Sequence, residues 1–79
     1  MTPEQAKAIV TGVTTCHKQF KPRLVECVTH KVYTVRFPEV SVDPRTVCKW
    51  FADAGGYVYQ IGTDVGTGEM YLYFMEVAA

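Results

Sequence analysis

The sequence predicts an α+β fold, a two-layer sandwich in which a mostly antiparallel four-stranded sheet carries its helices on one face. Two proline-led segments show apolar residues at helical spacing, and two longer segments are rich in β-branched and aromatic residues. Each longer segment is long enough for a hairpin, so the predicted order is α-β-β-α-β-β. With 79 residues, the chain can form one compact domain, residues 1–79, around one core.

The first predicted helix begins at Thr2, which can cap the free N–H groups, with Pro3 at the first helical position and Gln5 placed for a capping box. Apolar residues then recur at intervals of three and four and form one stripe for packing on a sheet. The stripe comprises Ala6, Ile9, Val10, Val13 and Cys16, with Phe20 in the same series. Gly12 and three threonines weaken the helix, so we expect fraying from Cys16 onward.

Residues 23–37 are too many for one strand and predict a hairpin with a three-residue turn at residues 29–31. This turn assigns alternate side chains to opposite faces. The predicted core face comprises Val25, Cys27, Tyr33, Val35 and Phe37. The other face is mixed enough to meet water and comprises Leu24, Glu26, Val28, Val32, Thr34 and Arg36.

The second predicted helix begins at Asp43-Pro44, a cap followed by proline, and ends at Gly55-Gly56. Its opposite sides differ in polarity. The apolar side comprises Val47, Cys48, Trp50, Phe51 and Ala54, and the polar side comprises Arg45, Lys49 and Asp53. Lys49 and Asp53 have the i,i+4 spacing of an ion pair. Because this helix holds the only tryptophan, we expect it to be the central piece of the core.

Residues 57–77 predict a second hairpin, with turn glycines in its middle and four tyrosines on its strands. On the last strand the better core face comprises Met70, Leu72 and Phe74, which turns Tyr71, Tyr73 and Met75 outward. Tyrosine offers a large, stiff, amphipathic contact area and is enriched at protein interfaces. The candidate partner-binding residues are therefore Tyr57, Tyr59, Tyr71 and Tyr73, with the acidic Glu69 and Glu76 of the same hairpin.

The length of the hairpin loop decides whether these tyrosines share a face. A five-residue loop over residues 64–68 sets Tyr59 opposite Tyr73 and Ile61 opposite Tyr71, which gathers an aromatic face. A four-residue loop shifts the parity and sends Tyr57 and Tyr59 to the core side. The alternative interpretation is that the tyrosines are large, half-buried residues of the sheet.

The two parts of the chain carry opposite net charges, although the chain is neutral overall. Residues 1–49 carry eight basic and four acidic residues, for a net charge of +4, and residues 50–79 carry four acidic residues and no basic one, for −4. Either the halves meet different partners, or they neutralise each other within one small fold. A candidate basic patch for single-stranded nucleic acid comprises Lys18, Lys21, Arg23, Lys31 and Arg36. The aromatic residues of the last hairpin lie in the acidic half, which favours a solvated rim over a phosphate-binding surface.

Catalytic and metal-binding motifs are weak. Cys27 and His30 are spaced C-x2-H, but Cys16 and Cys48 lie on two different helices, whereas structural zinc needs two tight ligand pairs. We expect three reduced, buried cysteines in a cytoplasmic protein, with no metal and no cofactor. No HExxH, serine-centred or phosphate-loop motif is present, so we expect a non-enzymatic protein and keep a small enzyme or enzyme subunit as an alternative. No apolar run is long enough to span a membrane.

In size and element order the chain resembles the small inhibitors that phages and mobile elements encode against bacterial CRISPR systems. The resemblance covers the whole chain and rests on no motif, so it assigns no role to any residue. It implies a protein of the host bacterial cytoplasm that occupies a surface of a CRISPR effector complex and blocks nucleic-acid engagement. The chain is expected to be a monomer or a homodimer, since an exposed tyrosine face or an unpaired edge strand can also serve self-association. Many such inhibitors mimic DNA through strong negative charge, whereas this chain is neutral overall.

Overall fold

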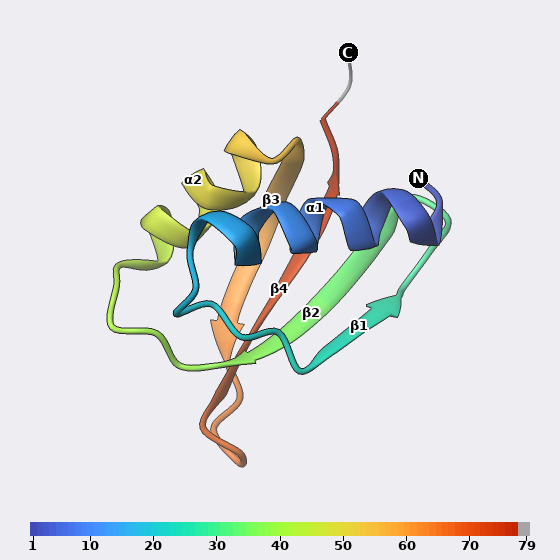
Figure 1. The fold of residues 1–79 in the computed structure, drawn as a ribbon. Coiled ribbons are helices and arrows are strands. Elements are labelled where there is room, and N and C mark those ends of the chain that lie inside the picture. The colour runs from blue at the N-terminus through green and yellow to red at the C-terminus, as the bar shows by residue number, and fades with distance from the viewer. Residues whose placement is uncertain (78–79) are drawn as a thin grey trace.

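The computed structural model describes residues 1–77 and contains the six expected elements in the expected order (Figure 1). They are α1 (Pro3–Cys16), β1 (Leu24–Cys27), β2 (Val32–Pro38), α2 (Pro44–Asp53), β3 (Gly56–Thr63) and β4 (Glu69–Glu76). The four strands form one antiparallel sheet in the order β1-β2-β4-β3, so β4 lies between β2 and β3. Both helices pack on the same side of this sheet (Figure 1), and the α+β prediction is confirmed.

Helix α1 begins and ends as its sequence predicts. The Gln5 N–H donates to Thr2 Oγ1 at 3.2 Å and the Thr2 N–H donates to Gln5 Oε1 at 2.7 Å, which completes the capping box. The stripe is buried over its first four members, Ala6, Ile9, Val10 and Val13. Phe20 is fully buried beyond the helix end, so the chain folds back onto the core after Cys16.

The first hairpin has the predicted three-residue turn. The Val28 N–H donates to the Val32 carbonyl at 2.9 Å, and the Val32 N–H donates to the Thr29 carbonyl at 3.2 Å. Strand β2 alternates between half-buried and buried side chains, with Tyr33, Val35 and Phe37 in the core. Strand β1 is a short edge strand, and on it only Val25 of the predicted core face is half-buried.

Phe51 of α2 lies at the centre of the core. Its ring lies 5.6 Å from that of Phe20, edge to face, and 5.2 Å from that of Phe74 on β4. Helix α2 is therefore a core element as predicted, through Phe51 more than through the tryptophan. Trp50 is buried at the margin between the helices, where its ring stacks on that of His17 at 4.1 Å with an interplanar angle of 13°.

The prediction that all three cysteines are buried is wrong. Cys16 and Cys27 are exposed and Cys48 is half-buried. Cys16 is the last residue of α1, beyond the part of the stripe that meets the sheet, and Cys27 is the last residue of the short edge strand. The expected pairing of Lys49 with Asp53 is also absent from the ion pairs of residues 1–77.

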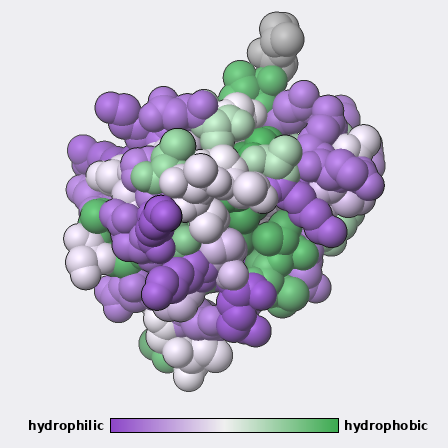
Figure 2. Space-filling model, in the orientation of Figure 1, coloured by the Kyte–Doolittle hydropathy of each residue, from purple (hydrophilic) through white to green (hydrophobic). Residues whose placement is uncertain are grey.

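Hydrophilic residues cover most of the side that carries the helices, with smaller hydrophobic areas between them (Figure 2). Within residues 1–77, no helix has the length and apolarity that crossing a membrane requires.

Replacement of Phe51 by alanine is expected to destabilise the protein by about 3–5 kcal/mol, because a fully buried ring at the centre of the core is lost. A domain of this size has only about 5 kcal/mol in total, so the urea midpoint followed by circular dichroism should fall close to zero denaturant. Val65→Ala, at a loop residue that is 98% exposed, is the control and should change stability by less than about 0.5 kcal/mol. A small effect of Phe51→Ala would contradict this account of the core.

Candidate binding face on the open side of the sheet

The sheet face opposite the helices is covered by no element of the described chain, and we call it the open face. The strand registers arrange its side chains in three rows that cross the sheet. The rows are Leu24-Arg36-Tyr71-Gly62, Glu26-Thr34-Tyr73-Gln60 and Val32-Met75-Tyr57. Because β4 is a central strand, its two tyrosines lie in the middle of this face.

The predicted register of the second hairpin is wrong by one residue near the loop. Five residues do separate β3 from β4, but the ladder continues past Thr63, with the Asp64 N–H donating to the Glu69 carbonyl at 2.7 Å. Ile61 therefore pairs with Leu72, and not with Tyr71. By itself this register would turn Tyr59 toward the helices.

A β-bulge reverses that shift. The register changes between Val58 and Gln60, so Tyr59 is an extra residue opposite Tyr73. Beyond the bulge Val58 pairs with Phe74 on the core side, and Tyr57 pairs with Met75 on the open face. All four candidate tyrosines thus lie on one face, through a bulge that the sequence did not indicate.

Three of the tyrosines form a continuous aromatic group. The ring centroids of Tyr59 and Tyr73 are 6.0 Å apart with an interplanar angle of 20°, and Tyr71 meets Tyr73 edge to face at 5.9 Å. The Arg36 guanidinium lies 6.0 Å above the Tyr71 ring, in the range of a cation–π contact. Tyr57 and Tyr59 are 55% and 45% exposed, while Tyr71 and Tyr73 are half-buried by their neighbours on the sheet.

Gly62 makes room for the Tyr71 ring. A Cβ atom at Gly62 would lie 2.8 Å from Tyr71 Oη and 2.9 Å from Cζ, closer than real Cβ atoms come to other groups. Gly62 therefore lies within β3, and not among the turn glycines predicted for the middle of this hairpin. The available signal was an isolated glycine in a strand pattern, which often marks a close approach.

Arg23 and Arg36 are both bound by carboxylates, at the end of the sheet where the loop joins β3 to β4. Arg23 Nε and Nη2 donate to the two oxygens of Glu69 at 2.6 and 3.0 Å, and Arg36 Nη1 donates to Asp64 Oδ2 at 3.1 Å. The hydrogen bond from Arg36 lowers the pKa of Asp64, and that from Arg23 lowers the pKa of Glu69. Each pair joins the basic half of the chain to the acidic half, so here the two halves neutralise each other.

The other predicted charged residues do not gather at the tyrosines. Glu76 has the parity of Leu72 and lines a hollow on the helical side. Lys18 and Lys21 are exposed in the connection from α1 to β1, and Lys31 lies in the turn before β2, at the end of that strand remote from Arg36. The five residues of the candidate basic patch therefore do not form one surface.

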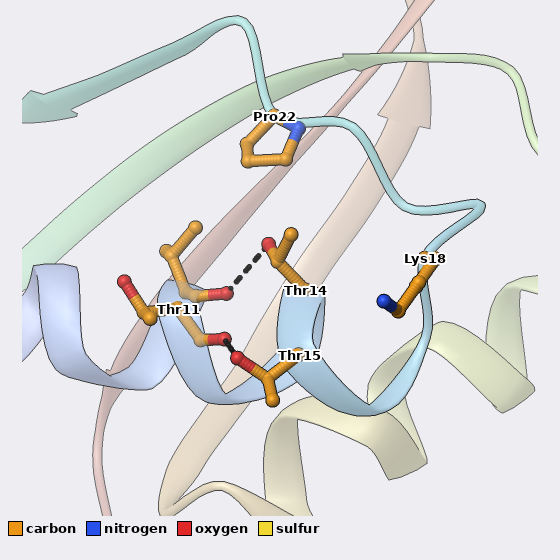
Figure 3. Close-up of a pocket in the computed structure, with 6 residues that line it drawn as sticks. Thr11, Thr14, Thr15, Lys18 and Pro22 are labelled. Atoms are coloured by element: carbon orange, nitrogen blue, oxygen red, sulfur yellow. Dashed lines mark hydrogen bonds between the residues drawn. The ribbon is translucent and has the colours of Figure 1, made fainter.

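A hollow beside the end of α1 is unsuited to an anion. It is lined by Val10, Thr11, Thr14, Thr15, Lys18 and Pro22 (Figure 3). The hydroxyls of Thr14 and Thr15 donate to backbone carbonyls one turn earlier, at 2.9 and 2.8 Å, so their protons are committed within the helix. The hollow also lies toward the C-terminal end of α1, where the helix dipole disfavours negative charge.

Within residues 1–77, no three His, Cys, Asp or Glu side chains lie close enough to hold a metal ion. Burial raises the pKa of the Cys48 thiol, which reduces its thiolate fraction at neutral pH.

The fold and the site together define a small α+β protein with an uncovered, tyrosine-rich sheet face. Comparison of the chain with protein families, with curated proteins and with solved structures gave no match.

Gly62→Ala is expected to destabilise the protein, because the new Cβ atom displaces the Tyr71 ring. In a Tyr71→Ala background the same change should be neutral or stabilising, since alanine is the better strand residue. The coupling between the two sites should be about 1 kcal/mol. Urea denaturation of the four proteins measures it. Equal effects of Gly62→Ala in both backgrounds would show that the ring does not lie over the glycine.

Stability should also fall as the solution is acidified. The pKa values of the Asp64 and Glu69 carboxyls are lowered in the folded state. Their ionised forms therefore stabilise the fold fully above the ordinary carboxyl pKa of about 4, and this stability is lost as the pH falls through the folded-state pKa values. We expect the urea midpoint to decrease from roughly pH 5 downward. The double variant Asp64→Asn, Glu69→Gln should be less stable at pH 7 and should show a flatter decrease. An unchanged pH profile in this variant would contradict the assignment.

Proposed function

We propose that the protein is a non-enzymatic binding module whose open face docks on another protein. The observation that carries the proposal is the group of Tyr59, Tyr71 and Tyr73, packed ring to ring on a sheet face that no element of residues 1–77 covers. Rings held by their neighbours lose little conformational freedom on binding, so they suit the centre of an interface.

The charges of the open face favour a protein partner over nucleic acid. Arg23 and Arg36 are paired with carboxylates, and Glu26 is exposed in the same face with no part in either ion pair. Phosphate binding depends on Lys and Arg side chains that are free to replace counterions. A nearly neutral aromatic surface is suited to the mixed apolar and polar surface of a protein.

The most concrete form of the proposal is an inhibitor similar to the anti-CRISPR proteins, which occupies a surface of a bacterial CRISPR effector complex and blocks nucleic-acid engagement. The size of the chain and its element order support this form. The neutral open face favours contact with a protein subunit of the complex over mimicry of DNA.

Tyr73→Ala is expected to weaken partner binding by about 1–2 kcal/mol, a five- to thirtyfold loss of affinity, because it removes the ring that joins Tyr59 to Tyr71. The test is capture of effector complexes from CRISPR-bearing bacteria by the immobilised protein, followed by affinity measurement and a DNA-binding assay with the purified complex.

Two variants serve as controls. Tyr73→Phe keeps the ring and should retain most of the affinity, and Lys18→Ala changes a residue away from the open face. Circular dichroism should show that Tyr73→Ala is folded. If no effector complex is retained across diverse hosts, the anti-CRISPR form of the proposal fails, and if Tyr73→Ala is unfolded, the ring belongs to the core.

Single-stranded nucleic acid is the second candidate partner, because Arg36 lies above Tyr71 beside Tyr73, and such a group can stack with bases. Fluorescence anisotropy of labelled oligonucleotides across salt concentrations distinguishes the two. Binding that weakens steeply with salt and is lost in Tyr73→Ala would favour nucleic acid. The protein-binding proposal expects no binding even at low salt.

A further inference from the structure

A groove with different chemistry lies at the free edge of β3, beside α2. It has a volume of about 370 Å³ and is lined by Arg45, Cys48, Lys49, Ala52, Gly56, Tyr57, Val58 and Val77. Its wall on α2 is basic at two positions, and its floor is largely apolar. Tyr57 and Val77 are 55% and 48% exposed at its margins.

The edge of β3 offers unpaired backbone groups to this groove. The strand pairs only with β4, and the ladder bonds from the Val77 N–H to the Gly55 carbonyl and from the Asp64 N–H to the Glu69 carbonyl fix which residues face β4. Alternation along an antiparallel ladder then directs the N–H and C=O groups of Gly56, Val58 and Ile61 toward the free edge. The bulge at Tyr59 divides this edge, so the part beside α2 can accept only a short extended segment.

Among residues 1–77, both charged side chains that line the groove are basic. Arg45 and Lys49 are exposed on α2, and neither takes part in the two ion pairs of residues 1–77. Three carboxylates are near along the chain, and none of them lines the groove. Asp43 caps α2 and accepts from the Arg45 N–H at 2.8 Å, Asp53 lines the hollow at the His17–Trp50 stack, and Glu76 lines the hollow at the start of β3 beside α1. An occupant of this groove therefore gains from negative charge.

We propose that this groove binds a short, extended, acidic peptide segment of a partner protein, which adds as a strand to the edge of β3 and directs its carboxylates to Arg45 and Lys49. Main-chain hydrogen bonds supply affinity in this mode of recognition, and alternate side chains supply specificity. Because side chains alternate across a strand, the valines between the carboxylates lie on the opposite face of the sheet, beside Tyr57. This site shares Tyr57 with the open face but does not use Tyr59, Tyr71 or Tyr73, and it does not depend on the function proposed for that face.

The test uses a heptapeptide that alternates valine with glutamate, titrated into the ¹⁵N-labelled protein and followed by NMR. We expect saturable shifts at Gly56, Val58 and the exposed residues of α2. The double variant Arg45→Glu, Lys49→Glu should bind this peptide about tenfold more weakly. The double variant Lys7→Glu, Lys18→Glu reverses two exposed charges away from the groove, so it is the matched control and should bind as the unaltered protein does.

Two further peptides separate strand addition from simple charge attraction. A version N-methylated at alternate residues keeps the charge and loses the backbone donors, so it should bind at least tenfold more weakly. A version with lysine in place of glutamate should cause no saturable shift. Equal binding of the N-methylated peptide, shifts confined to Tyr71 and Tyr73 on the open face, or no saturable shift with the glutamate peptide would each overturn the proposal.

Discussion

The pairing of β4 with both β2 and β3 is the constraint on which the structure depends. A central strand contributes to both layers, so Leu72 and Phe74 fill the core beneath the helices while Tyr71 and Tyr73 occupy the opposite face. Because side chains alternate with a period of two, a slip of one residue on β4 would exchange these sets. Burial of two large apolar side chains therefore fixes the placement of the tyrosines at the same time.

Two local departures from a regular hairpin complete the aromatic group. The bulge at Tyr59 restores the parity that the loop register would otherwise reverse, and it aligns that ring with Tyr73. Gly62 removes a side chain where the Tyr71 ring lies across the sheet. Both features weaken β3 as a strand, since a bulge interrupts the ladder and glycine lacks a side chain to pack. The ring contacts on the open face offset part of that loss.

Opposite charges from the two parts of the chain pair at one end of the sheet but not beside β3. At one end of the sheet the halves meet as Arg23 with Glu69 and Arg36 with Asp64, which leaves the aromatic face nearly neutral. Beside β3, by contrast, Arg45 and Lys49 stay free of these pairs. A neutral charge total thus conceals two surfaces of unlike chemistry, one aromatic and one basic with an apolar floor.

Local patterns in the sequence determined the elements, because a capping box at Thr2, a cap and proline at Asp43, and alternation along residues 32–37 act over a few residues. They also determined which side of β4 is core. An isolated glycine at position 62 marks a close approach, but it does not say that Tyr71 makes it. Strand order, the bulge at Tyr59 and the identity of this neighbour depend on contacts between strands, and no local pattern encodes them. Cys16 and Cys27 show the same limit, since periodicity places a side chain on a face, while only packing in three dimensions decides how far that face is covered.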